Sequence, residues 1–311
     1  MAASPAAQEP DALLATGPAS DSEVAAYAAA LGLPGLFDVH VHLMPERVQA
    51  KVWEHFDRLA HRTWPIRYRI PPAQRLSTLD SLGAARHTAL AYAHRPGMAA
   101  WLNEHTLGLA AAHPAVVPSF TFYPEPDAPA YVAAALESGG RCAKVHLQVG
   151  RFHAADPRLD EVWRMLRERR IPVVMHASAV DDGSGGSEYC GPGEVAALLE
   201  RFPGLVVVVA HLGAPDYAGF LDLARSTPAL RFDTTMAITD PPFIAEFPAS
   251  RLSQLEELGD RVLFGSDFPT IPHDYAAAVR GLARLGFGAA WLRAVLWENA
   301  SRLVAAAAPA R

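Results

Sequence analysis

The sequence is poor in cysteine, in basic charge and in long hydrophobic runs, and each shortage excludes a class of protein. Its 311 residues include two cysteines, Cys142 and Cys190, too few for a disulfide framework. That usage is typical of a reducing, cytoplasmic location. The formal net charge is -6 and no basic patch stands out, so we expect no nucleic-acid binding. No run of about 20 apolar residues occurs, so we expect no transmembrane helix.

The chain length and the first residues predict one domain behind a short tail. Residues 1–20 are rich in alanine, proline and serine and lack the basic and apolar regions of a secretory signal, so we expect a flexible tail. Half of all residues (50%) are hydrophobic, enough for a large core. A barrel of roughly 250 residues forms one domain. We therefore predict a single domain over residues 21–306.

From Gly35 onward, short β-branched runs alternate with amphipathic stretches. The predicted strands are 36–42, 87–93, 115–122, 141–147, 171–177, 205–212, 230–235 and 261–267. Between strands, apolar residues recur at spacings of three and four, as in the stretch 156–170. This alternation predicts an α/β fold, a closed (β/α)₈ TIM barrel with helices outside a parallel sheet. An open doubly wound sheet is the alternative, but no glycine fingerprint follows the first strand.

Two insertions interrupt the alternation, residues 46–85 after the first strand and residues 178–193 after the fifth. Both follow the carboxyl end of a strand, where a barrel places its active site. The second insertion is rich in glycine and serine but lacks the lysine and the spacing of a P-loop. We interpret it as a mobile lid.

The stretch GLFDVHVHLMP, residues 35–45, ends the first predicted strand with two histidines one residue apart. Residues i and i+2 of a strand share a face, so His40 and His42 can offer two nitrogen ligands to one ion. The alternative is a pair of polar residues at the exit of a strand.

Other predicted strands also end in polar residues after apolar runs. These residues are Lys144 and His146 on the fourth strand, His176 on the fifth, His211 on the sixth and Asp267 on the eighth. Such a group needs a partner, because burying it alone costs several kcal/mol. One such residue is usually a cap, but several that meet at one rim predict a divalent-metal site.

The motifs DVHVH, VVMHAS, VVVVAHLGAP, FGSDFP and ENASRLV, in this order, resemble those of the amidohydrolase superfamily. The resemblance runs from about Leu33 to Val304. The contexts HLGAP and GSDFP are similar to the amidohydrolase-related branch, which includes aminocarboxymuconate-semialdehyde decarboxylase and resorcylate-type decarboxylases. The resemblance thus implies the same barrel fold and a metal-dependent enzyme.

The resemblance also implies roles for individual residues. One divalent metal, usually zinc and sometimes manganese, would be bound by His40, His42, His176 and Asp267. His211 would contact the substrate or activate a metal-bound water, and Asp267 would also accept a proton.

Lys144 leaves the number of metals open. In other branches a carboxylated lysine at this place bridges two metals, and His176 and His211 would then bind the second. We favour one metal. A third interpretation pairs Lys144 with a buried acid such as Asp38. His146 shares the strand face of Lys144, so it can line the pocket or contribute to a second metal site.

The sequence therefore predicts a metal-dependent hydrolase that cleaves a C–N or C–O bond of a small molecule, which can carry a carboxylate. The alternatives are non-oxidative decarboxylation of a small aromatic or unsaturated acid at the same metal, and a barrel that only binds its ligand. Arg67 and Arg69 could clamp a substrate carboxylate or could be ordinary surface arginines. A small-molecule substrate is the expected partner, and homo-oligomer formation stays open.

Overall fold

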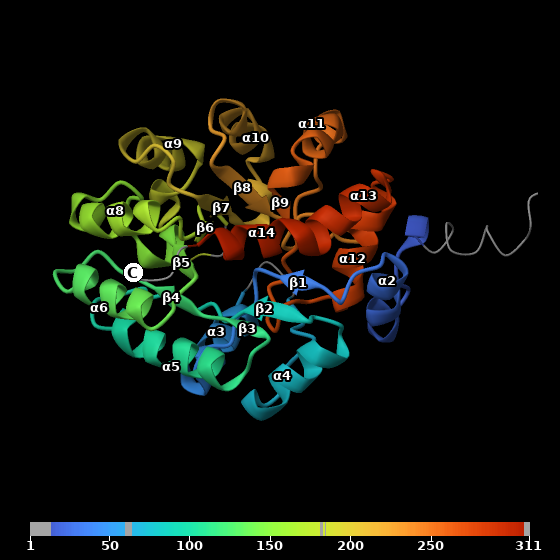
Figure 1. Cartoon of the computed structure of the whole chain (residues 1–311), viewed down its shortest axis with the longest axis horizontal. Helices are drawn as coiled ribbons and strands as arrows, with labels where there is room; N and C mark the ends of the chain where they lie inside the picture. Colours follow the sequence, from blue (N-terminus) through green and yellow to red (C-terminus); the bar gives the residue numbers. More distant parts are fainter. Residues whose placement is uncertain (1–13, 60–63, 181–182, 184, 308–311) are drawn as a thin grey trace, which may run out of the picture.

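In the computed structural model, a ring of parallel strands is surrounded by helices (Figure 1). The structure describes residues 14–59, 64–180, 183 and 185–307. The strands are β1 (Phe37–Asp38), β2 (Arg86–Thr88), β3 (Val116–Val117), β4 (Ser119–Thr121), β5 (Cys142–His146), β6 (Val173–His176), β7 (Val207–Val209), β8 (Leu230–Asp233) and β9 (Val262–Leu263). They pair in chain order in two sheets, β1-β2-β3 and β4-β5-β6-β7-β8-β9.

The two sheets join into one closed ring. Pro118 has no backbone N–H, so the predicted strand 115–122 is divided into β3, which pairs with β2, and β4, which pairs with β5. On the other side, Val39 N donates to Phe264 O at 2.9 Å and Val41 bridges Phe268. These contacts join the first predicted strand to the last. The predicted (β/α)₈ TIM barrel is confirmed, and the open sheet is wrong.

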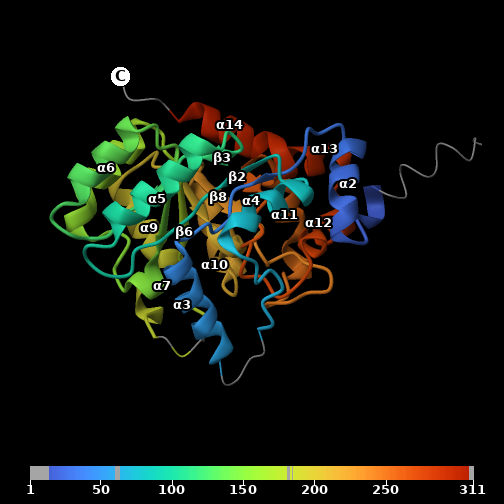
Figure 2. The same cartoon turned by 90° about the horizontal axis from the view of Figure 1, so that it is seen from below.

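Helices surround the ring and close one of its ends. They are α2 (Val24–Ala30), α3 (Glu46–Asp57), α4 (Pro72–Ser81), α5 (Ala99–Ala112), α6 (Ala128–Glu137), α7 (Leu147–Gly150), α8 (Asp160–Glu168), α9 (Pro192–Arg201), α10 (Tyr217–Ser226), α11 (Leu252–Glu257), α12 (Tyr275–Arg284), α13 (Gly288–Arg293) and α14 (Asn299–Ala306). In α14, Ala300 and Val304 pack against the interior of the barrel, at the end opposite α3 (Figure 2). Within the described part of the chain, no helix has both the length and the apolar character that a membrane crossing needs.

The amphipathic stretches form helices because their apolar residues lie on one face. In α8, for example, Val162, Trp163 and Leu166 are all fully buried. This confirms the helix expected between the fourth and fifth predicted strands. The first insertion likewise forms α3 and α4.

Three N–H donors fix the first insertion to the loop that follows β9. Gln49 Nε2 and Trp53 Nε1 donate to Thr270 Oγ1 at 3.0 and 3.3 Å, and Trp64 Nε1 donates to Thr270 O at 2.9 Å. The described part of the insertion therefore has a defined position above the carboxyl ends of the strands.

Both segments that were expected to be mobile contain residues outside the described part. Of the predicted tail, residues 1–20, the structure describes residues 14–20, where Pro18 O accepts a hydrogen bond from Arg280 Nη1 at 2.8 Å. In the second insertion, residues 181, 182 and 184 lie outside the described part. Val180, just before them, is bonded through both backbone groups to the Gln148 amide, at 2.6 and 3.0 Å. The lid stays a prediction.

Candidate metal centre

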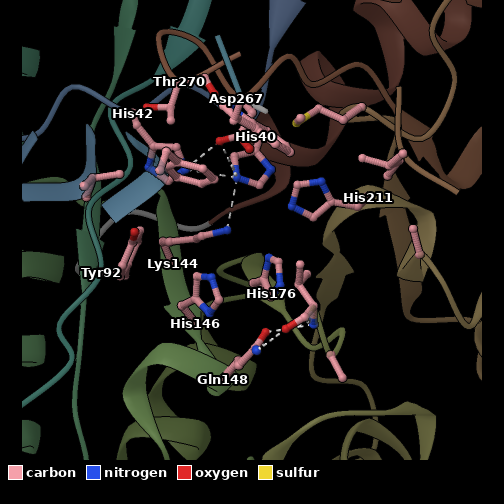
Figure 3. A pocket seen from close by; sticks show the side chains of 18 of the residues that line it. His40, His42, Tyr92, Lys144, His146, Gln148, His176, His211, Asp267 and Thr270 are labelled. Atoms are coloured by element: carbon pink, nitrogen blue, oxygen red, sulfur yellow. Dashed lines mark hydrogen bonds and ion pairs between the residues drawn. The ribbon is translucent and has the colours of Figure 1, made fainter. Parts of the chain in front are cut away.

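One cavity of about 530 Å³ collects the predicted site residues at the carboxyl ends of the strands (Figure 3). Its lining includes all seven of them: His40, His42, Lys144, His146, His176, His211 and Asp267. They come from β5, β6 and the segments that follow β1, β7 and β9.

His40 and His42 present unprotonated nitrogens to each other. His40 Nδ1 lies 2.9 Å from Asp233 Oδ2 and His42 Nδ1 lies 3.1 Å from the Leu90 carbonyl oxygen. Because both partners are acceptors, each Nδ1 carries the proton and each Nε2 keeps its lone pair. The two Nε2 atoms are 3.2 Å apart, and Asp267 Oδ1 lies 3.1 Å from that of His42.

Two lone pairs and a carboxylate this close repel each other unless a proton or a cation lies between them. The three ligand atoms of His40, His42 and Asp267 all lie within 4.8 Å of one another. Ligands about 2.0–2.1 Å from a tetrahedral zinc ion are roughly 3.3 Å apart, close to the separations in this group. These residues therefore fit a divalent cation.

The carboxylate of Asp233 fixes His40 from behind, and the sequence interpretation missed it. It is fully buried at the end of β8, and it accepts hydrogen bonds from His40 Nδ1 and from His211 N, at 2.9 Å each. Burial alone would raise its pKa, but the proximity of His40, which donates a hydrogen bond to it, and of His211 lowers the pKa to about 2. The signal was available, because Asp233 is an acidic residue near the carboxyl end of the predicted strand 230–235.

Lys144 lies beside His40 and not beside Asp38. Its Nζ is 3.1 Å from His40 Nε2, and burial lowers the Lys144 pKa to about 8 although Asp233 and Asp267 act in the opposite direction. The Asp38 carboxylate instead accepts hydrogen bonds from three donors: His40 N, Ser266 N and Tyr275 Oη. Asp38 thus holds together the ends of the first and last strands, and the proposed Lys144–Asp38 pair is wrong.

His211 also keeps a lone pair for the cavity. Its Nδ1 lies 3.0 Å from the Thr235 carbonyl oxygen, so Nδ1 carries the proton and Nε2 does not. The backbone of His211 is left-handed, with φ 58°, as is that of Asp267 with φ 73°. Residues other than glycine seldom adopt this conformation, and here it turns both side chains toward the cavity (Figure 3).

His146 and His176 stack on each other, with ring centroids 3.8 Å apart. His146 Nδ1 accepts a hydrogen bond from Val149 N at 3.4 Å, so its Nε2 carries a proton. His176 lies outside the group of His40, His42 and Asp267. Its Nε2 is buried and has no hydrogen-bond partner among the described residues.

Burial keeps four of the cavity imidazoles neutral. It lowers the pKa of His40 to about 4, helped by the charge of Lys144, and it holds the pKa values of His146 and His176 well below 6.5. The pKa of His211 is also lowered, again mainly by burial. A neutral imidazole is the form that binds a metal, so these residues need not lose a proton first.

We predict that the metal-free protein loses stability as the pH falls from about 6.5 toward 4. In that window the unfolded chain binds more protons at His40, His146, His176 and His211 than the folded chain does, so protonation favours unfolding. The pKa shift of His40 alone lowers the free energy of unfolding by about 3 kcal/mol over the full window. Asp38 opposes this trend, because burial raises its pKa to about 7 and its folded form binds the extra proton. Urea unfolding of chelator-treated protein at pH 7 and pH 5 measures the sum. Equal or greater stability at pH 5 would show that the histidines do not dominate.

Arg67 and Arg69, for which the sequence left a substrate clamp and ordinary surface arginines open, form no clamp at the cavity. Arg67 pairs with Asp274 and Arg69 with Asp57, and both arginine side chains are substantially exposed. Neither residue lines the cavity. The alternative interpretation, surface arginines, is confirmed.

The fold and the site together define a TIM barrel with a candidate metal centre at its mouth. The chain belongs to the amidohydrolase family, whose model, described as Amidohydrolase, matches residues 16–305. This membership confirms the resemblance found in the sequence and supports an enzyme that uses a divalent metal. None of the curated proteins matches the sequence.

Solved structures share the fold at low sequence identity. An uncharacterized TIM-barrel protein from Bordetella bronchiseptica is 20% identical with a TM-score of 0.68, over 88% of this chain and 99% of that one. 4-Oxalomesaconate hydratase from Rhodopseudomonas palustris is 15% identical with a TM-score of 0.57, over 87% and 96%. Dihydroorotase from Campylobacter jejuni is 14% identical with a TM-score of 0.54, over 86% and 82%. At these identities the likeness concerns the fold and does not extend to a substrate.

Proposed function

We propose that this protein is a metal-dependent hydrolase that cleaves a C–N or C–O bond of a small molecule. The observation that carries the proposal is the convergence of His40 Nε2, His42 Nε2 and Asp267 Oδ1 within 4.8 Å at the floor of the cavity. These three residues would hold one divalent cation, and the unpartnered Nε2 of His176 would be the fourth ligand. Three imidazoles and one carboxylate suit zinc, with manganese as the alternative.

When bound, the cation supplies Lewis-acid activation of a water molecule and of the scissile group. The residues of this chain supply proton transfer and orientation. Asp267 lines the floor of the cavity with its Oδ1 3.1 Å from His42 Nε2, and its carboxylate can accept a proton there. The His211 lone pair can accept a hydrogen bond or a proton, and the His146 Nε2–H can donate to a substrate oxygen.

We propose one metal and not two. Lys144 Nζ lies 3.1 Å from His40 Nε2, so its amine already borders the first site. His146, the other candidate of the same strand, offers a proton and not a lone pair toward the cavity, so it adds no ligand for a second ion. His211 then remains available to the substrate.

The experiment that tests the proposal is a panel of small lactones, esters and amides assayed with the zinc- or manganese-loaded protein. Release of acid or amine is the expected product signal. Non-oxidative decarboxylation at the same site is the alternative, and small aromatic or unsaturated acids in the same panel test it by release of carbon dioxide. Carbon dioxide release without any hydrolysis would contradict the proposal. Ligand binding without turnover in either assay would favour the binding barrel.

A further inference from the structure

Above the histidines, the wall of the cavity is apolar and largely contributed by the first insertion. Its apolar residues include Val52, Phe56, Leu59, Trp64, Met236 and Ile244. The first four belong to α3 and the segment after it, and the last two follow β8. A volume of about 530 Å³ lies in the range of roughly 300–1,000 Å³ that is typical of small-molecule sites.

This wall is held in place before any ligand binds. The rings of Phe56 and Trp64 pack at 5.0 Å between centroids, and Trp64 packs edge-on against Phe243 at the same distance. The hydrogen bonds from Gln49, Trp53 and Trp64 to Thr270 tie the same elements to the loop that carries Asp267. A preorganised wall selects ligands by shape and polarity because it gains little by adapting to them.

The polar side chains of the wall offer no donor that would attract a carboxylate. The Oε1 of Gln49 is buried without a partner among the described residues, but it is an acceptor and would repel one. Gln49 Nε2 donates to Thr270, and the Gln148 amide bonds Val180 through both of its ends. Of the lining residues that the structure describes, the charged ones are Lys144 and Asp267, both at the floor. A carboxylate placed against Val52, Phe56 and Ile244 would lose its hydration without gaining an ion pair, which is costly.

We infer that the substrate has an uncharged, apolar body, an aromatic ring or a branched alkyl group, attached to the group that is hydrolysed. The body lies against the wall formed by α3 and the residues after β8, and the scissile ester, lactone or amide reaches the floor. This inference rests on the proposed function and narrows it: a carboxylate on the body, distant from the scissile group, is disfavoured.

Binding of hydroxamic acids to the zinc-loaded protein, measured by calorimetry, tests the inference without turnover. Hydroxamates chelate a metal, so one series varies only the body: acetohydroxamate, benzohydroxamate, 4-isopropylbenzohydroxamate and 4-carboxybenzohydroxamate. We expect benzohydroxamate to bind at least about tenfold more tightly than acetohydroxamate, because the ring buries apolar surface. The isopropyl compound should bind at least as well, and the carboxy compound, of similar size, at least about tenfold more weakly than the isopropyl one.

A charged variant of the wall provides a second readout, with a matched control on the same helix. Val52→Lys places an ammonium in the wall and should reverse the preference between the carboxy and isopropyl compounds. Ala50→Lys adds the same charge at an exposed position of α3 and should leave the preference unchanged. Circular dichroism checks that both variants fold.

The experiment separates failure of the apolar body from failure of the metal centre. Tight binding of all four hydroxamates with equal affinity, or the same ranking in Val52→Lys as in the wild type, would overturn the apolar body and leave the metal centre intact. If no hydroxamate binds the zinc-loaded protein, the proposed metal centre fails, and the inference fails with it.

Discussion

Replacement of Asp267 by asparagine is expected to lower kcat/KM by about 10³-fold or more. The amide has nearly the shape of the carboxylate, but it cannot accept a proton and it is a weaker ligand for a cation. Loss of a positioned acid–base group alone costs about 10²–10⁴-fold in rate. Hydrolysis of the best substrate of the panel, measured for both proteins at equal metal loading, gives the ratio.

A surface aspartate provides the control for this substitution. Asp222 is 53% exposed and pairs with Arg251, away from the cavity. Asp222→Asn should retain the wild-type rate. An Asp267→Asn variant that keeps more than about a tenth of the wild-type kcat/KM would remove Asp267 from the mechanism.

The second large effect is expected for His211→Ala, with a loss of about 10² or more in kcat/KM. This is the scale of losing a positioned proton acceptor or a group that stabilises developing charge. Because we assign His211 to the substrate, the variant should keep its full metal content. Kinetics and elemental analysis of the same preparation measure both quantities.

Lys144→Met is the comparison that separates one metal from two. With one metal, the loss of the Lys144 amine should lower activity only moderately, since it binds no cation. If two metals are bound, Lys144→Met and His211→Ala should each release one of them. A fall to half the metal content in both variants would contradict the single-metal proposal.

The ring of strands could be predicted because each strand is a short apolar run between helical stretches. How many residues of each run form a regular strand could not be predicted. The predicted strand 36–42 is regular only at Phe37–Asp38, and beyond Asp38 single contacts, such as the Val41–Phe268 bridge, take the place of a continuous ladder. The division of the strand 115–122 follows from Pro118, which was visible in the sequence but not used.

For the candidate site, the sequence could predict which residues lie at the ends of individual strands. His40, His42 and Asp267 lie together because i and i+2 share a face and because the first and last strands are neighbours in a closed ring. Side-chain contacts between different strands could not be predicted from these rules. Asp233 bonds His40 across 193 positions of the sequence, and the pairing of Lys144 with His40 spans 104.

The apolar wall of the cavity could not be predicted either, because its residues come from separate segments of the chain. Phe56, Trp64 and Phe243 form one aromatic row, yet they come from two segments of the chain that no local pattern connects. The basic residues Arg67 and Arg69, which looked suited to a carboxylate, are neutralised by Asp274 and Asp57. Substrate preference therefore depends on packing among the loops and could be inferred only from the folded chain.

The metal content of the purified protein tests the central proposal most directly. Elemental analysis of the wild type, His42→Ala and His153→Ala compares a ligand with a surface histidine, since the His153 side chain is 59% exposed and pairs with Glu194. We predict about one divalent metal per chain in the wild type and in His153→Ala, and a large loss in His42→Ala. Full retention of metal in His42→Ala, or no affinity of the wild type for zinc or manganese, would contradict the account.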